Sequence, residues 1–167
     1  MPTSTYEPIA TYTLPDSTTN SFAFTIIPTT FQHLVLVVNF SATQDARVVR
    51  LNFNNDTGPN YEMMGFGGNS GTINDSEGFL LDAITSPVLS GTTTTQYLPT
   101  IFNIFNYKST NQYKQLTFRG AGQTETNYFG AVWRDLAAIN RIDISIQDPS
   151  PKLFKITSMA TLYGIRS

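Results

Sequence analysis

Cysteine is absent from the 167 residues, and histidine occurs once, at His33. The absence of cysteine excludes disulfides, thiolate metal ligands and a cysteine nucleophile. A single histidine excludes a histidine-rich metal site, and a serine–histidine–aspartate triad would have to use His33. Because His33 opens an apolar stretch and no G-x-S-x-G segment supplies a nucleophile, we interpret it as a structural or surface residue.

Charge is also scarce. The chain has 10 Lys+Arg against 12 Asp+Glu, and charged residues form 13% of it, about half of the usual share of roughly 25%. No basic excess is available for phosphate contacts, so we do not expect nucleic acid as a partner. The longest strongly apolar stretch, 34–38, is too short to cross a membrane, and no secretion signal is visible. We therefore expect synthesis in a cytosol and no membrane insertion.

Neutral polar and aromatic residues are abundant instead. Thr, Ser and Asn number 24, 13 and 13, and aromatic residues form 13% of the chain. Thr, Phe and Tyr favour strands, whereas Asn, Ser, Gly and Pro favour turns. The helix formers Glu and Lys are few, at four each. This composition predicts an all-β protein, and the length is that of one domain.

Short alternating apolar runs separated by turn residues recur along the whole chain. They predict about nine or ten strands, almost no helix, and an antiparallel sandwich or barrel. Trp133, Leu36, Val38, Ile144 and Leu162 are the predicted core. We expect a polar loop over 65–78, one helical turn over 135–138, a sandwich domain over 10–167, and a Pro- and Thr-rich N-terminal arm over 1–9 that is ordered by another chain. The expected strands are 10–14, 22–26, 33–40, 48–53, 61–66, 79–84, 97–107, 113–119, 128–134, 139–146 and 154–165.

Three polar patterns in the sequence are candidates for a catalytic, metal or phosphate site. A glycosidase needs a pair of carboxyl groups, and the chain offers Asp75 and Glu77 together in the expected loop, with Glu62 and Glu125 elsewhere. Nothing near these residues in the sequence would raise a carboxyl pKa. The segment 54–56, Asn-Asn-Asp, offers oxygen ligands for calcium without the spacing of a calcium loop. The glycine-rich segment 65–69 lacks the lysine of a phosphate-binding loop. Turn and loop structure explains each pattern, so we predict no catalytic residue, metal or cofactor.

Aromatic rings among neutral amides and hydroxyls are typical of sugar-binding surfaces, where rings stack on pyranose faces. Most rings in a sandwich this aromatic belong to the core or to subunit interfaces. We predict Tyr6, Ile9, Tyr61, Phe66 and Asn69 as interaction residues. The aromatic candidates for a glycan site are Tyr61, Phe66, Tyr97, Tyr107, Tyr113, Tyr128 and Trp133.

Several phrases occur in a set order along nearly the whole chain. They are Thr5-Tyr6-Glu7-Pro8-Ile9-Ala10, the segment 24–34, Leu51-Asn52-Phe53-Asn54-Asn55-Asp56-Thr57-Gly58-Pro59-Asn60-Tyr61, the segment 107–114, Val132-Trp133-Arg134, Ala137-Ala138-Ile139 and Thr161-Leu162-Tyr163-Gly164-Ile165. Together they resemble a family of small β-rich proteins of tailed bacteriophages that are described as virion structural proteins. The resemblance implies a single jelly-roll-type β-sandwich on the outer surface of a particle, and it supplies no catalytic residues.

Four functional hypotheses follow. The first is a capsid decoration, or cement, protein that clamps neighbouring capsid subunits. The alternatives are a tail-associated receptor-binding or fibre-tip domain and a free carbohydrate-binding module, both of which would bind host-surface glycan. An enzyme is disfavoured because no acid, base and nucleophile converge in the sequence. The low charge predicts a homo-oligomer, and analogy with jelly-roll virion proteins favours a trimer.

Overall fold

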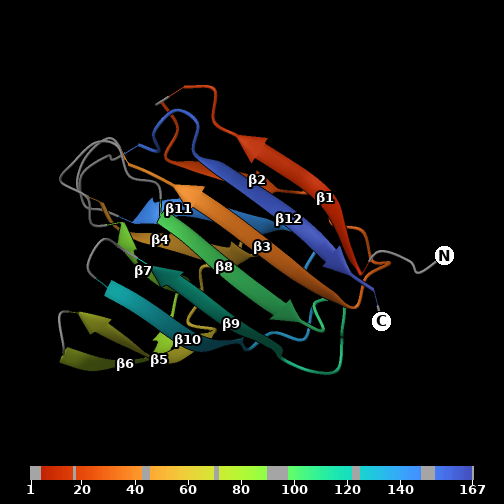
Figure 1. Cartoon of the computed structure of the whole chain (residues 1–167). Coiled ribbons are helices and arrows are strands. Elements are labelled where there is room, and N and C mark those ends of the chain that lie inside the picture. The colour runs from red at the N-terminus through yellow and green to blue at the C-terminus, as the bar shows by residue number, and fades with distance from the viewer. Residues whose placement is uncertain are drawn as a thin grey trace.

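Two antiparallel sheets packed face to face form the protein (Figure 1). The computed structural model describes residues 5–16, 18–42, 46–69, 72–89, 98–121, 125–147 and 153–166. This part of the chain contains no helix that could span a membrane. Its strands are β1 (Tyr6–Thr13), β2 (Ser21–Phe24), β3 (His33–Phe40), β4 (Ala46–Phe53), β5 (Tyr61–Asn69), β6 (Thr72–Leu81), β7 (Ile84–Leu89), β8 (Leu98–Phe105), β9 (Lys114–Ala121), β10 (Glu125–Trp133), β11 (Ile142–Gln147) and β12 (Met159–Ile165).

The strand order is that of a jelly roll. One sheet contains the neighbours β1-β12-β3-β8, and the other is β2-β11-β4-β7. When these eight strands are numbered among themselves along the chain, the orders become 1-8-3-6 and 2-7-4-5. This is the double Greek key of a jelly roll, in which most consecutive strands lie in opposite sheets. The predicted jelly-roll sandwich is confirmed, but the described residues form twelve strands instead of the nine or ten expected.

Two inserted hairpins extend the larger sheet to eight strands. The hairpin β5–β6 is inserted between β4 and β7, and β9–β10 is inserted between β8 and β11. The two insertions pair through β10 and β5, so the order continues as β8-β9-β10-β5-β6. Figure 1 shows β5 and β6 at the end of this sheet that lies farthest from β1.

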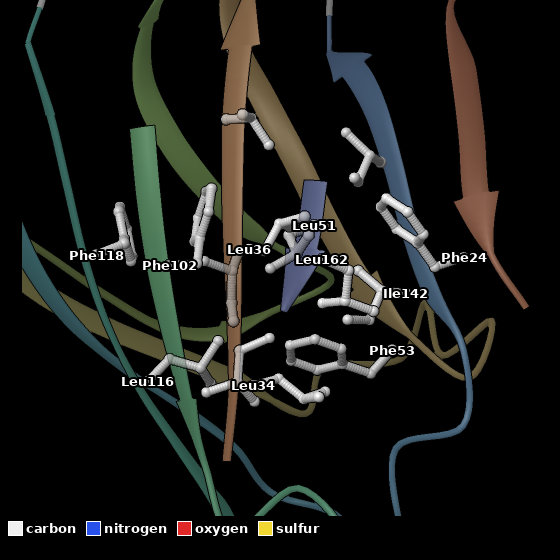
Figure 2. Close-up of a cluster of buried hydrophobic side chains, with 14 of the residues drawn as sticks. Phe24, Leu34, Leu36, Leu51, Phe53, Phe102, Leu116, Phe118, Ile142 and Leu162 are labelled. Carbon is white, nitrogen blue, oxygen red and sulfur yellow. The ribbon is translucent and has the colours of Figure 1, made fainter. Parts of the chain in front are cut away.

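The core lies between the two sheets (Figure 2). The alternation of β3 sends Leu36 and Val38 inward, and all five residues predicted for the core are at most 2% exposed. Figure 2 shows Leu51, Phe53 and Ile142 of the smaller sheet beside Leu34, Leu36 and Leu162 of the larger one. Burial of such side chains is worth about 1.5–3 kcal/mol each, so this layer is the main source of stability.

The N-terminal strand begins earlier than expected. β1 starts at Tyr6 and pairs with β12 of the same chain, from Tyr6 opposite Ile165 to Thr13 opposite Met159. Residues 6–9, which we expected to belong to an arm ordered by another chain, are therefore in the chain's own sheet. Residues 1–4 lie outside the described residues.

The polar loop expected over 65–78 is wrong, because β5 and β6 form a hairpin there. The glycines serve close packing between strands. A Cβ on Gly65 would lie 2.3 Å from the Phe129 ring and 2.4 Å from the Tyr128 carbonyl oxygen of β10. Glycine within a strand marks such an approach as well as a turn, and the sequence pattern alone does not separate the two.

The helical turn expected over 135–138 is also wrong. The described backbone there is not helical, and the Asp135 carboxylate accepts a hydrogen bond from the Ala137 backbone N–H at 2.7 Å. This is a turn closed by an aspartate side chain, which competes with helix formation. At the C-terminus, β12 begins at Met159, and Phe154 forms only an isolated bridge with Ala42.

Two strand glycines of the larger sheet provide a matched test of this packing. A Cβ on Gly164 would lie 2.2 Å from the Phe31 ring, whereas a Cβ on Gly130 would meet nothing within 4 Å. We expect Gly164→Ala to lower the free energy of unfolding by about 1–3 kcal/mol, because the core must move to accept the methyl group. Gly130→Ala should leave it unchanged or slightly raised. Urea unfolding measures both, and equal effects would contradict the described packing.

Candidate functional site

The outer face of the larger sheet is poor in charge over seven of its eight strands, whereas on the edge strand β6 the rows continue at Glu77, opposite Met64, and at Asp75, opposite Phe66. Cross-strand pairing places three rows of seven side chains across β1, β12, β3, β8, β9, β10 and β5 on the face turned away from the smaller sheet. Within these rows only Glu62 and Arg119 carry a full charge, and Glu62 is paired with Arg134 at 2.9 Å. The rows are Tyr6, Ile165, His33, Phe105, Gln115, Val132 and Glu62; Pro8, Tyr163, Val35, Asn103, Thr117, Gly130 and Met64; and Thr11, Thr161, Val37, Ile101, Arg119, Tyr128 and Phe66.

An antiparallel sheet with one face in water normally carries polar and charged side chains on that face. Here the middle of the face is apolar or neutral, and Val35 is only 5% exposed although it points outward. Depletion of charge together with enrichment of aromatic and aliphatic residues characterises the centre of protein interfaces. The outer face therefore has the chemistry of a surface that packs against another protein.

A hollow of about 690 Å³ lies in this face over β9, β10 and β5. Gly130 leaves open space at its floor, because it has no side chain. Met64 and Phe66 stand exposed at its edge, and the Phe66 ring lies 5.9 Å from the Tyr128 ring. We name this feature the apolar hollow. It has the shape and the chemistry to accept an apolar side chain of a partner.

A second hollow of about 570 Å³, the amide hollow, lies where β8 turns into β9. Its lining combines two rings with neutral carboxamides, and no charged residue belongs to it. Tyr113 is 52% exposed at this position. The lining residues are Phe105, Asn106, Asn111, Gln112, Tyr113, Gln115 and Leu136.

Two buried side chains hold the loop that carries the amide hollow. At its start, the Tyr107 hydroxyl donates to the Pro28 carbonyl, and burial raises the pKa of Tyr107. At its end, Lys114 is fully buried, and its Nζ donates to the carbonyls of Gln112 at 3.2 Å and Asp135 at 3.1 Å. Desolvation lowers the pKa of Lys114. The exposed residues 108–113 are thus fastened at both ends.

His33 also positions this loop. Its Nδ1 accepts a hydrogen bond from the Asn106 backbone N–H at 3.1 Å, and its ring lies edge-on to Phe105 at 5.5 Å. Asn106 has a φ of 50°, a left-handed conformation that asparagine tolerates better than most residues. The Gln32 side chain donates to the Asn106 Oδ1 at 2.9 Å. These contacts give His33 a structural role: it helps to hold the start of the loop in place.

Asp56 is the centre of a hydrogen-bond network at the same end of the molecule. Its Oδ2 accepts from the Trp133 indole N–H at 2.7 Å and from the Asn60 side chain at 2.9 Å, and its Oδ1 accepts from the Gly58 backbone N–H at 2.8 Å. Burial opposes ionisation, but these three donors overcome it and hold the pKa of Asp56 below its usual 3.8. Asn54 and Asn55 turn the chain with φ values of 53° and 59°. Of the oxygens considered for calcium, those of Asp56 and the Asn54 Oδ1 thus accept hydrogen bonds from protein N–H groups.

Tyr61, predicted to contact a partner, is fully buried. Its hydroxyl accepts from the Phe53 backbone N–H at 3.0 Å and donates to the Asp56 carbonyl at 3.1 Å. Desolvation raises the pKa of Tyr61 to about 12. The predicted interaction role is wrong for this residue, because its ring packs on Phe53 and Trp133 beneath the part of the sheet that the two inserted hairpins form.

The other predicted interaction residues are dispersed. Tyr6 is exposed on the outer face, and Ile9 of the same strand packs against the core. Phe66 borders the apolar hollow, and five strands lie between its strand and that of Tyr6 in the sheet order. The backbone of Asn69 ends β5, and its side chain lies outside the described residues. The structure thus places Phe66 in a candidate site and does not bring the five residues together.

The aromatic candidates divide by burial. Tyr107 and Trp133 are core residues, whereas Tyr113 and Tyr128 are exposed at the two hollows. Tyr97 lies outside the described residues. Met64, Gly130, Gln112 and Gln115 are not among the site residues predicted from the sequence. Met64 and Gly130 lie within the strands expected over 61–66 and 128–134, and their alternation with inward-facing neighbours is the signal that places them on the outer face.

The acidic residues do not form a catalytic pair in the described structure. Glu62 is paired with Arg134, Asp143 with Arg141, and Glu7 with Arg166. The side chains of Asp75, Glu77 and Glu125 lie outside the described residues. Among the residues that are described, no three His, Cys, Asp or Glu side chains lie close enough together to hold a metal ion.

Comparisons with known proteins add little. No protein-family model matches the chain, and no curated protein matches it. A crystal structure of a protein of unknown function from Shewanella oneidensis MR-1 aligns with 96% of this chain and 75% of its own, at 12% sequence identity and a TM-score of 0.25. This similarity is too slight to show a shared fold.

The Asp56 network makes a pH-dependent contribution to stability. Because the pKa of Asp56 is lowered in the folded protein, its contribution is present above the unfolded pKa near 3.8 and is lost as the pH falls through the folded value. We expect Asp56→Asn to lower the free energy of unfolding at pH 7 by about 1.5–3 kcal/mol, because the three N–H donors then no longer share a charged acceptor. Below that pH range the variant and the wild type should converge.

Urea unfolding at a series of pH values measures this effect. Asp16→Asn is the control, since Asp16 is exposed and accepts only from Thr18 in its own loop. It should shift the pH 7 midpoint little. A gap between Asp56→Asn and wild type that stays constant from neutral to acidic pH would exclude the ionised Asp56 as its source.

Proposed function

We propose that this chain is a non-enzymatic structural protein of a bacteriophage virion. In this proposal it lies on the particle surface, where it decorates the capsid and clamps neighbouring capsid subunits. The scarcity of charge on the outer face between β1 and β5 of the larger sheet is the observation that carries the proposal. In a free monomer such a face promotes non-specific association, whereas in a closely packed assembly it can be buried against a neighbouring subunit.

The size of this face supports a packing role. Seven strands spaced about 4.8 Å apart, with three rows about 6.8 Å apart, cover about 600 Å². Contact of this face with an equal area on a neighbouring copy would bury about 1,200 Å² in total, which reaches the lower limit of stable protein interfaces. We therefore propose that copies of this chain associate through the outer face as a homo-oligomer, with a trimer favoured by analogy to other jelly-roll virion proteins.

The fold and the phage resemblance support the virion setting. Jelly rolls are a recurrent architecture of viral capsid proteins. The first and last phrases that resemble the phage family, 5–10 and 161–165, pair with each other as β1 and β12. A sandwich in which β1 pairs with β12, without disulfides, suits a particle that is assembled in a reducing cytoplasm and must persist outside the cell.

A tail-associated receptor-binding domain is the second candidate. The amide hollow favours it, because neutral carboxamides beside an exposed tyrosine suit host-surface glycan. A capsid decoration protein and a tail domain differ in abundance, since a capsid offers hundreds of equivalent positions and a tail offers few.

The number of copies per particle separates the two candidates. We expect quantitative mass spectrometry of purified phage particles to find this chain in hundreds of copies, comparable with the major capsid protein. A few to a few dozen copies would favour the tail-associated role. Complete absence from purified particles would refute a virion role of either kind.

The role of the outer face in assembly is tested by adding one charge to it. Met64 is 63% exposed on this face, so Met64→Glu should preserve the fold while placing a charge in the proposed interface. We expect light scattering to show an oligomer for the wild type and a mass near the 18.5 kDa of one chain for the variant. Ile26→Glu is the matched control, because Ile26 is an exposed residue outside the three rows. Dissociation by both variants, or a monomeric wild type, would argue against the proposed interface.

A further inference from the structure

We infer that the amide hollow is a binding site for neutral carbohydrate. It lies at the loop end of the larger sheet, between the β8–β9 loop and Leu136. Only Phe105 and Gln115 of its lining belong to the rows of the outer face. The inference does not rest on the particle location, because it concerns a ligand of the isolated chain.

The chemistry of the lining matches a polyhydroxylated, uncharged ligand. Each carboxamide of Asn106, Asn111, Gln112 and Gln115 presents both a donor and an acceptor, and a sugar hydroxyl requires both. Within the described residues, the carboxamides of Gln112 and Gln115 make no hydrogen bond to protein, so their capacity is free for a ligand. Because the lining contains no charged residue, it offers no counter-charge to a phosphate, a carboxylate or a basic peptide.

The exposed ring supplies the second element of sugar recognition. Tyr113 and Phe105 both line the hollow, and the Tyr113 ring is exposed to solvent. An aromatic face carries partial negative charge and attracts the polarised C–H groups on one face of a pyranose ring. The hydroxyls at the edge of that pyranose would then meet the carboxamides. Rings with neutral amides thus fit carbohydrate better than a purely apolar ligand, which the apolar hollow would suit.

The loop is fixed before any ligand binds. Tyr107 and Lys114 anchor its ends, and the Ser109 hydroxyl donates to the Asn111 Oδ1 at 2.7 Å within it. The Ser109 backbone N–H donates to the Asn106 carbonyl at 2.9 Å. A loop that is already ordered loses little conformational entropy on binding, which allows a shallow site to hold a weakly interacting ligand.

The available space suits more than one sugar unit. The amide hollow of about 570 Å³ lies within the usual range for small-molecule sites. A smaller hollow of about 350 Å³ adjoins it across Asn106 and Gln112, and it adds the neutral residues Gln32 and Ser109 and one charged residue, Lys108. We therefore expect an oligosaccharide to be preferred over a monosaccharide.

The test uses the full chain on an array of neutral and acidic oligosaccharides, followed by titration of each neutral compound that is retained. We expect retention of neutral oligosaccharides and a weakening of roughly tenfold or more on Tyr113→Ala, because the ring is the main apolar contact. Gln112→Ala should weaken binding less. Tyr128→Ala is the matched control, since Tyr128 is similarly exposed on the same sheet but lines the apolar hollow.

Three results would overturn the inference. They are retention of no neutral oligosaccharide, retention of acidic ones alone, and equal weakening by Tyr113→Ala and Tyr128→Ala. Thermal unfolding of each variant accompanies the titration, and unchanged melting temperatures show that lost binding is not lost folding. None of these outcomes changes the copy number on the particle, so failure of this inference is distinguishable from failure of the proposed function.

Discussion

The indole ring of Trp133 holds the added hairpins and the jelly roll in one body. Asp56, in the connection from β4 to β5, accepts the indole N–H, and the Lys114 ammonium lies 5.5 Å from the ring centroid. The carboxylate thus meets the edge of the indole and the cation lies over its ring, where β4, β5, β9 and β10 converge. Each charge has hydrogen-bond partners, which is the condition under which ionised groups are tolerated away from water. Loss of the ring would leave both charges without their shared neighbour.

Both candidate surfaces depend on this cluster. The extension that it fastens provides β9, β10 and β5, which carry the apolar hollow, and the Lys114 bond to the Gln112 carbonyl fixes the loop of the amide hollow. The Lys114 ammonium therefore has a positioning role, because its two carbonyl partners belong to the loops that follow β8 and β10. A methionine of similar length would fill the space but leave both carbonyls without a donor, and an unpaired buried carbonyl costs about 1–3 kcal/mol.

Strands with strong periodic patterns were predictable from the sequence, whereas the extension was not. The bounds of β3 are those expected for 33–40, because its run of aliphatic residues fits only a buried strand. The glycines after residue 64 predict a loop, whereas Gly65 and Gly67 in fact admit β10 at close range. The hollows depend on register between segments up to about seventy residues apart, so no local pattern shows which aromatic rings stay exposed. Tyr61 and Tyr113 look alike in sequence and differ only in which face their strand or loop presents.

The scarcity of charge constrains how such a protein recognises anything. Attraction between charges acts over about a Debye length of 8–10 Å and weakens with salt, so it guides encounters before contact. The outer face and the amide hollow instead offer apolar surface and neutral hydrogen-bonding groups, which act only at contact and need matching shapes. Selectivity must therefore come from geometry: from the open space over Gly130, the pair of rings beside it, and the fixed spacing of carboxamides around Tyr113. This is a reason for the rigid anchoring of the loop, since shape-based recognition is lost when the shape moves.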